Sequence, residues 1–202
     1  MLKLHHASKT RSVRVLWLLE ELGVPYELNV VPFTQEFLKS PAFLRVNPCG
    51  SLPAIEDDGV VMFESGAILE YLLERYGNGR LAVAPGSPAR PRYLQWFHFG
   101  EATLLPPLGD IAQHALFRPE AERIPAMVAD GQRRAAARLD VLEQALAASP
   151  YLCGDAFTAA DVMVGYGVAI ARLLGVVGER HPNVAAYLAR LEARPAFQKA
   201  FA

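Results

Sequence analysis

The sequence contains only two cysteines, Cys49 and Cys153, which lie far apart and do not have the spacing of metal ligands. A disulfide-stabilised scaffold is therefore not expected, and a reducing compartment fits the composition. An excess of charge of one sign is also lacking, because the formal net charge is −1 at pH 7. Such a chain has no strong electrostatic attraction for nucleic acid or an anionic membrane. We expect no metal, no nucleic-acid partner and no membrane partner.

Long apolar runs are missing too. The longest, Val162–Ala171, ends at Arg172 and falls short of the ~20 residues that a membrane-spanning helix needs. The N-terminus passes directly into a strand-like segment, Leu2–His5, without a signal peptide. Hydrophobic residues make up 52% of the 202-residue chain, enough for one large or two small packed domains. We expect a soluble cytoplasmic protein.

The first half of the chain alternates strand and helix patterns. A strand, a helix and a second strand make a βαβ unit, in which the two strands are parallel. An Asp-Gly pair between apolar runs is a strong hairpin signal. Together these elements predict a small mixed sheet flanked by helices. In order, we expect a strand at Leu2–His5, a helix at Val13–Leu22 ended by Gly23, a strand at Val24–Val31, a helical piece at 35–45 interrupted by Pro41, a hairpin around Asp58-Gly59, and a helix at Glu64–Tyr76.

Glycine and proline gather between residues 77 and 91, which predicts a domain boundary there. Beyond it strand signals vanish and helical periodicity takes over, so the second domain should be all-α. Thr158 and Asp161 have the spacing of a helix capping box, which we assign to folding. The expected parts are an α/β domain at 1–79, a linker at 80–90 and a helical domain at 91–202. Its expected helices begin at Arg92, with an interruption at Pro106-Pro107, and continue at Ala121–Ala148, Val162–Val177, Asn183–Ala193 and Pro195–Phe201.

The stretch from Asn47 to Ser65 has features suited to a small zwitterionic peptide. Proline cannot donate to a sheet ladder, so the backbone beside Pro53 is open to an extended peptide that adds as a strand. A hydroxyl at a helix start, here Ser65, can bind a carboxylate with help from the helix dipole. The carboxylate of Glu64 can hold an ammonium. Two simpler interpretations stay open, with Ser65 as a helix N-cap and Glu64 as a solvated charge.

The run NPCGSLPAI from Asn47 to Ile55, followed by Glu64-Ser65, resembles the glutathione site of the glutathione transferases. In that family the proline is cis, the residue before it pairs through its main chain with the cysteinyl unit, and the Glu-Ser pair holds the γ-glutamyl end. The resemblance covers the whole chain. It implies a thioredoxin-like N-terminal domain and an all-α C-terminal domain. The glutathione-binding residues that it implies are Arg11, Ser51, Leu52, Pro53, Glu64 and Ser65.

The loop after the first strand resembles the Asn-Ser-Arg-Ser-x-Arg loop of a bacterial and fungal, serine-type branch of the family. The family's first serine falls on Thr10. Agreement with the pattern extends to Arg11, Ser12 and Arg14. The match implies Thr10 and Ser12 as the catalytic hydroxyls that stabilise the glutathione thiolate, with Ser8 ranked third. A helix N-cap is the other interpretation of Ser12.

Two further positions near the expected site need an interpretation. Many members of the family carry Lys, Arg or Gln where this chain has Ser51. Lys39 or Gln35 could take over a contact to the glycyl carboxylate of the peptide, although solvated surface residues are the simpler interpretation of both. His5 and His6 lie at a strand end, and we expect them to be structural or exposed.

The implied reaction is attack of the glutathione thiolate on a hydrophobic electrophile, as in detoxification. We expect the electrophile between the domains, near the helix Trp96–Leu108. Glutathione is then a co-substrate, and the implied assembly is a homodimer through the helix Glu64–Tyr76 and the helices around Tyr93 and Ala135. Two alternatives stay open: a non-catalytic binding or regulatory protein with this fold, and glutathione-dependent peroxidase or thiol-exchange chemistry. The loop after the first strand has no cysteine for exchange, and a packed thiol is our interpretation of Cys49.

Overall fold

The computed structural model describes residues 1–202 as two compact units. The first unit comprises Met1–Ala82 together with Ala193–Ala202, and the second comprises Val83–Glu192. The chain therefore returns to its first unit at the C-terminus. The domain boundaries expected from the sequence, 1–79 and 91–202 with a linker between them, stay predictions.

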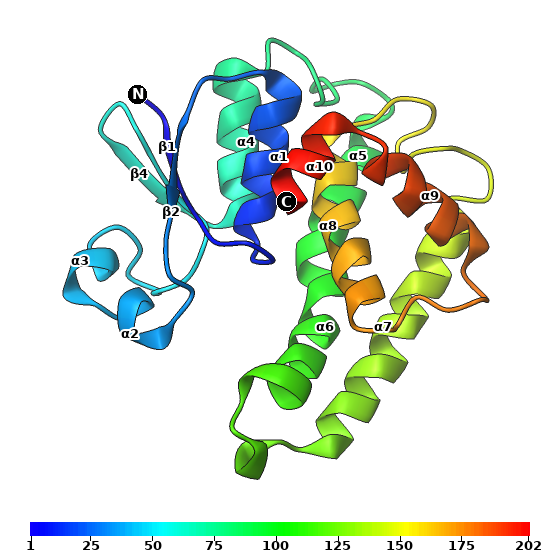
Figure 1. Cartoon of the computed structure of the whole chain (residues 1–202). Helices are drawn as coiled ribbons and strands as arrows, with labels where there is room; N and C mark the ends of the chain where they lie inside the picture. The colour runs from blue at the N-terminus through cyan, green and yellow to red at the C-terminus, as the bar shows by residue number, and fades with distance from the viewer. The chain divides into compact units, whose positions relative to one another are not determined.

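A four-stranded sheet forms the centre of the first unit, with strand order β2-β1-β3-β4 (Figure 1). β1 and β2 are parallel, as the βαβ pattern predicted, whereas β3 is antiparallel to both β1 and β4. Helices α1 and α4 lie side by side along this sheet (Figure 1). The arrangement is thioredoxin-like, as expected. Its elements are β1 (Lys3–His6), α1 (Ser12–Leu22), β2 (Glu27–Val30), α2 (Gln35–Leu38), α3 (Pro41–Leu44), β3 (Ala54–Asp57), β4 (Val60–Phe63), α4 (Ser65–Tyr76) and α10 (Pro195–Phe201).

Local sequence signals explain where several of these elements end or turn. Gly23 takes a left-handed conformation with φ of 66° and donates to the carbonyls of Leu19 and Glu20, which closes α1. The hairpin between β3 and β4 turns through Asp58 and Gly59, whose φ angles are 48° and 85°. Positive φ at both central residues is what a tight hairpin of this kind requires, so the Asp-Gly prediction is confirmed.

The C-terminal helix α10 packs on α1 within the first unit. The ring of Trp17 on α1 is fully buried, and its centroid lies 4.9 Å from that of Phe197. Arg194 donates to both carboxylate oxygens of Glu21, at 2.6 and 2.7 Å. Such a bidentate pair adds orientation to the apolar contact.

The second unit is helical, as the loss of strand signals predicted. Helix starts and ends differ from the sequence estimates by several residues, because short π-helical and 3₁₀ turns separate the α-helices. The prolines Pro106 and Pro107 fall in the first turn of an α-helix that follows a π-helical turn, so the interruption occurs where it was predicted. The elements are α5 (Arg90–His98), η1 (π, Phe99–Leu104), α6 (Leu105–Ala112), η2 (π, Gln113–Phe117), η3 (3₁₀, Glu120–Glu122), α7 (Pro125–Ala145), α8 (Ala159–Leu173) and α9 (Pro182–Glu192).

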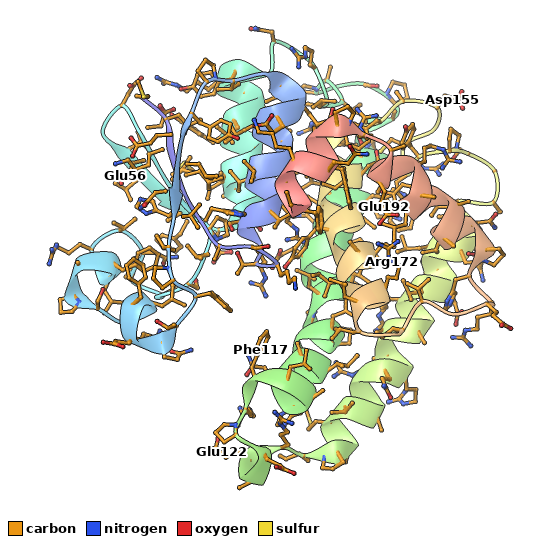
Figure 2. All side chains as sticks on the ribbon, in the orientation of Figure 1. Glu56, Phe117, Glu122, Asp155, Arg172 and Glu192 are labelled. Atoms are coloured by element: carbon orange, nitrogen blue, oxygen red, sulfur yellow. The ribbon has the colours of Figure 1, made fainter.

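Helix α8 is the buried helix of the second unit, and its capping box is formed as predicted. Thr158 N donates to Asp161 Oδ2 at 2.8 Å, while the buried Asp161 also accepts from the hydroxyl of Tyr187 at 3.1 Å. Near the other end of α8, Arg172 donates to Glu192 on α9, and both side chains are labelled in Figure 2. None of the chain's helices combines the length and the apolar character needed to cross a membrane.

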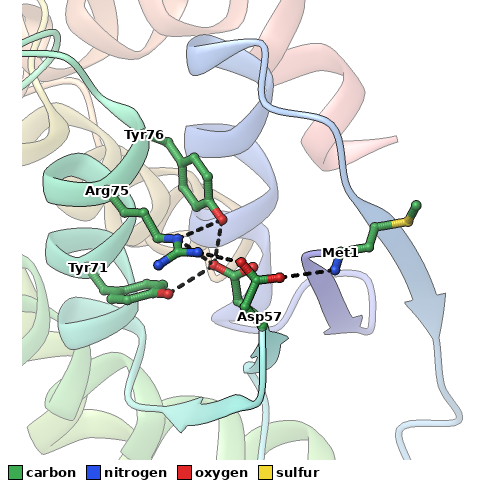
Figure 3. A network of polar contacts seen from close by, with 6 residues as sticks. Met1, Asp57, Tyr71, Arg75 and Tyr76 are labelled. Carbon is green, nitrogen blue, oxygen red and sulfur yellow. Dashed lines mark hydrogen bonds and ion pairs between the residues drawn. The ribbon is translucent and has the colours of Figure 1, made fainter.

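A polar network anchors the β3–β4 hairpin to the C-terminal end of α4 (Figure 3). The hydroxyls of Tyr71 and Tyr76 both donate to Asp57 Oδ2, at 2.9 and 2.6 Å, and the guanidinium of Arg75 lies 3.3 Å from the same oxygen. Asp57 is only 1% exposed. Burial, with the neighbouring carboxylate, raises the pKa of both tyrosines, so they stay protonated donors at neutral pH. The network ties one end of α4 to the sheet, while the other end begins beside β4.

Replacing the buried carboxylate should destabilise the first unit. In Asp57→Ala the two tyrosine hydroxyls lose their acceptor, and we expect the free energy of unfolding to fall by about 1–3 kcal/mol. Urea denaturation followed by circular dichroism measures this change. The neighbouring variant Asp58→Asn is the control, because Asn tolerates the positive φ of this position and the Asp58 side chain is exposed. Equal losses in the free energy of unfolding in the two variants would show that the buried Asp57 carboxylate contributes no more to stability than the exposed Asp58.

Candidate functional site

The register of the sheet brings three loops to one edge. His5 on β1 pairs with Ala54 on β3, and Ala54 pairs with Phe63 on β4. Since β1 and β4 end where β3 begins, residues 7–11, residues 51–53 and Glu64 leave or enter the sheet next to one another. The expected site residues of the first half are therefore assembled at this edge. The peptide bond between Leu52 and Pro53 is cis, as the resemblance implied.

The loop before Pro53 is held by a buried asparagine. Asn47 donates through Nδ2 to the carbonyl of Ser51 at 2.6 Å, and its Oδ1 accepts from Cys49 N at 3.0 Å. Gly50 has a φ of 59°, and a Cβ at this position would lie 2.7 Å from the carbonyl oxygen of Leu38. Only glycine fits both the backbone angle and the close approach. These two residues fix the path of the chain into β3.

The side chain of Leu52 packs in a small apolar cluster. This packing holds the Leu52 backbone in place at the sheet edge where the three loops meet. Ser51 is exposed next to it, and Cys49 is also exposed, so the expectation of a packed thiol at Cys49 was wrong. Pro53 is buried. The cluster consists of Ala7, Val31, Leu38, Phe43 and Leu52, with Phe37 partly buried against it.

A lysine reaches the same turn from α2. Lys39 Nζ donates to the carbonyl of Cys49 at 2.9 Å, which places an ammonium close to Ser51. Gln35 is exposed at the start of α2. Lys39 and Gln35 were the two candidates to replace a basic side chain at position 51. Of these two, Lys39 is held at the turn by its hydrogen bond to Cys49.

At the start of α4, the serine does not occupy the N-cap position. Glu64 is the N-cap residue and has a φ of 73°, while Ser65 is the first residue of the helix and is buried. The side chain of Glu64 makes no capping hydrogen bond. The N-cap interpretation of Ser65 was therefore wrong, and its hydroxyl has another partner.

That partner is a buried arginine on α1. Arg14 is 0% exposed, and its Nη1 donates to Ser65 Oγ at 3.2 Å. A hydroxyl that accepts from a guanidinium keeps its own proton for donation. In the sequence, Arg14 agrees with the family's loop pattern, but that agreement does not reveal its partner. The available signal was a charged residue within the apolar run Val13–Leu19, since a fully buried arginine requires specific polar partners.

The loop after β1 folds around two hydroxyls. Ser12 is 0% exposed, and its Oγ accepts from Ala7 N at 3.2 Å, so it does not act as the N-cap of α1. Thr10 is 9% exposed, and its Oγ1 donates to the carbonyl of Ala7 at 2.8 Å and lies 2.7 Å from Ser12 Oγ. Ser8 and Arg11 are exposed at the two sides of this turn. Among the three hydroxyl residues of this loop, Thr10 is intermediate in exposure, since Ser12 is more buried and Ser8 is exposed.

The two histidines of β1 are both buried, so the expectation that they are exposed was wrong, while a structural role stays a prediction. His5 Nε2 lies 2.8 Å from Glu56 Oε1, and its Nδ1 lies 2.9 Å from Asn29 Nδ2. His6 Nδ1 lies 2.9 Å from Ser12 Oγ. Burial lowers the pKa of His6 and keeps the ring neutral at neutral pH.

The electrostatics of this edge suit an anionic ligand with one ammonium group. The N-termini of α1 and α4 both begin here, and helix N-termini carry a partial positive charge. The cations Arg14 and Lys39 add to that field, and Glu64 is the exposed carboxylate among them. The chain has no group of three or more His, Cys, Asp and Glu side chains arranged to hold a metal ion.

Comparison with known proteins identifies the family. The N-terminal domain of glutathione S-transferases matches residues 1–74, and the C-terminal domain matches residues 120–190. "Glutathione S-transferase 3" of Schizosaccharomyces pombe is 31% identical, over 97% of this chain and 85% of its own length.

Solved structures agree. A glutathione transferase from Phanerochaete chrysosporium, in complex with oxidised glutathione, has a TM-score of 0.88 and 29% identity, over 99% of this chain and 94% of its own. A homologue from Lodderomyces elongisporus with two glutathione molecules per subunit has a TM-score of 0.89 and 25% identity, over 99% and 97%. This chain belongs to the glutathione S-transferase family.

Proposed function

We propose that this protein is an active glutathione transferase, which joins the glutathione thiolate to a hydrophobic electrophile. The observation that carries the proposal is the meeting of the Thr10 hydroxyl, the Leu52 main chain and the Ser65 hydroxyl at one sheet edge of a family member. The solved relatives described above hold glutathione or its oxidised form, which supports the same ligand here.

Each part of the peptide has a partner at this edge. The γ-glutamyl carboxylate accepts from the Ser65 hydroxyl at the start of α4, and the γ-glutamyl ammonium pairs with Glu64. The cysteinyl unit pairs with the main chain of Leu52, next to Pro53. The glycyl carboxylate lies at the turn where Lys39 is held, near Ser51. Arg11, exposed at the start of α1, adds positive charge beside the bound peptide.

The reaction requires a thiolate, and a free thiol has a pKa of about 8.5. We propose that Thr10 donates the hydrogen bond to the sulfur. The family pattern selects Thr10 and Ser12, and Thr10 is the less buried of these two residues. The N-terminus of α1 favours the same negative charge. Ser12 then forms a hydrogen bond with Thr10 on its buried side and does not contact the ligand. The thiolate attacks the electrophilic carbon, a carbon–sulfur bond forms, and the displaced electron pair leaves with the leaving group.

We assign contacts with the electrophile to the helical stretch Trp96–Leu108. It contains the π-helical turn η1, and π-helical turns occur frequently at functional sites. No specific observation favours a non-catalytic role or thiol exchange, and the exposed Cys49 lies on the loop before Pro53, not on the one that carries Thr10.

We further propose a homodimer that covers β4. This edge strand exposes apolar side chains, with Val61 49% exposed, and leads directly into α4. Exposed apolar edge strands favour association with another chain. Light scattering at micromolar concentration should give twice the chain mass of 22.1 kDa. Val61→Lys should give monomers, whereas Val30→Lys on the opposite edge strand, where the valine is 66% exposed, should not. A monomeric wild-type protein would refute the dimer.

The role of the α4 start can be measured by binding. Ser65→Ala removes a charge-assisted hydrogen bond to the γ-glutamyl carboxylate and should weaken glutathione binding by roughly 1–3 kcal/mol. Isothermal titration calorimetry gives the affinity. Ser87→Ala, a serine of the second unit, is the control and should bind like the wild type. Unchanged affinity in Ser65→Ala would remove this residue from the ligand site.

The role of Thr10 can be measured by titration of the bound thiol. Thr10→Val keeps the shape but removes the donor, so the pKa of bound glutathione should rise by about one unit and turnover near neutral pH should drop about ten-fold. Ultraviolet absorbance of the thiolate, followed against pH, gives this pKa. Ser8→Ala removes an exposed hydroxyl from the same loop and should leave the curve unchanged. A curve that moves for Ser12→Ala but not for Thr10→Val would transfer the sulfur contact to Ser12.

A further inference from the structure

His6, Ser12 and Thr10 form a chain of hydrogen-bonding groups beneath the proposed sulfur position. Ser12 Oγ lies 2.9 Å from His6 Nδ1 and 2.7 Å from Thr10 Oγ1, and it accepts from Ala7 N at 3.2 Å. All three side chains are buried. A buried hydroxyl with this many neighbours cannot satisfy them all with one proton, so the direction of each hydrogen bond matters.

With a proton on His6 Nδ1, one arrangement satisfies every group. A hydroxyl has one proton and two lone pairs. Ala7 N–H then fills one lone pair of Ser12 Oγ, and His6 Nδ1–H fills the other. The proton of Ser12 can go to Thr10 Oγ1 at 2.7 Å or to the carbonyl of Ala7 at 3.2 Å, and Thr10 is the nearer acceptor. Thr10 Oγ1 also accepts from Ser12 N at 3.3 Å, which fills both of its lone pairs. The only proton of Thr10 then points away, toward the carbonyl of Ala7 at 2.8 Å or toward a bound sulfur.

The other tautomer of the histidine reverses the chain. If Nδ1 has no proton, it accepts from Ser12, and the second lone pair of Ser12 takes the proton of Thr10. Thr10 then has nothing to donate to a sulfur, and the carbonyl of Ala7 keeps the backbone N–H of Thr10, at 3.3 Å, as its donor. A bound thiolate therefore favours the first arrangement, because only there does the Thr10 hydroxyl have a proton to donate to the sulfur.

We propose that His6 is a positioning residue that donates from Nδ1 to Ser12, and thereby directs the proton of Thr10 toward the glutathione sulfur. The proposal rests on the proposed function, in which Thr10 meets the sulfur. Burial lowers the pKa of His6, so the ring is neutral near pH 7 and places no second proton on the chain. Consecutive hydrogen bonds polarise one another, so a Thr10 hydroxyl that accepts twice is a stronger donor to the thiolate.

The test compares side chains that keep or lose a donor at the Nδ1 position. In His6→Asn the amide nitrogen can occupy the place of Nδ1, whereas His6→Phe keeps the ring shape without a donor. His6→Gln, with its amide near the Nε2 position, replaces the phenylalanine variant if that one does not fold. Each is made in the full chain, alone and with Thr10→Val. The readouts are the pKa of bound glutathione and the affinity for S-methylglutathione, which has no thiol to ionise.

In His6→Phe the pKa of bound glutathione should rise by about half a unit, the size expected for a polarising contribution. His6→Asn should restore the wild-type value. With Thr10→Val present, His6→Phe should add no shift, and S-methylglutathione should bind equally in every variant.

Three results would overturn the role of His6: no shift in His6→Phe, the same shift in His6→Asn, or an equal shift on the Thr10→Val background. Weaker binding of S-methylglutathione in His6→Phe and in His6→Asn alike would indicate a merely structural residue and also overturn it. If Thr10→Val alone left the thiol pKa unchanged, the proposed role of Thr10 would fail instead.

Discussion

The alignment of three strand ends is the constraint on which the site depends. His5, Ala54 and Phe63 pair across β1, β3 and β4, so the loops after β1 and β4 and the loop before β3 share one edge. Side chains alternate between the faces of a sheet, so a slip of one residue would turn every side chain of a strand to the other face. The hairpin turn fixes the register of β3 with β4, and the network around Asp57 ties this hairpin to α4.

Buried polar groups hold the loops at this edge and support the neighbouring side chains that we propose to bind the ligand. Asn47 supports the turn that carries Ser51, Ser12 supports the loop that carries Thr10, and Arg14 supports Ser65. Buried polar side chains are costly unless they are hydrogen-bonded, so each support also stabilises one arrangement of its loop. Reactive groups on loops gain their precision from such a rigid base.

Patterns that depend on neighbouring residues were predictable from the sequence, whereas contacts between distant residues were not. The parallel βαβ unit, the Asp-Gly hairpin and the Thr158–Asp161 capping box follow from local rules, and all three are present. The π-helical turn η1 has no signal in local propensity. Gly100 within it lies so close to α8 that a Cβ there would be 2.7 Å from the backbone of Met163, a contact between residues far apart in the chain. The packing of α10 on α1 joins residues far apart in the chain, which no periodicity reveals.

The same limit applies to the site. The residues proposed to face the ligand lie in short motifs and were selected by resemblance, but the residues that support them were not. His6 and Arg14 act through burial and through partners on other elements, which a linear pattern does not display. A polar residue inside an otherwise apolar strand or helix is the one sequence signal for such a supporting residue. It indicates that a hydrogen-bond partner exists but does not identify that partner.

Threonine at position 10, where the family pattern has serine, fits this division of roles. A β-branched side chain has fewer accessible χ1 rotamers than serine, so less conformational freedom is lost when its hydroxyl is held in one direction. The contacts of Oγ1 with Ala7 and Ser12 hold the χ1 rotamer, and the fixed configuration at Cβ then sets the position of the methyl group. If Thr10 meets the sulfur as proposed, its methyl group displaces water from the thiolate, and hydrogen bonds are stronger where water is excluded. The buried Ser12, whose Oγ lies 2.7 Å from Thr10 Oγ1, restricts the direction in which the Thr10 proton can point.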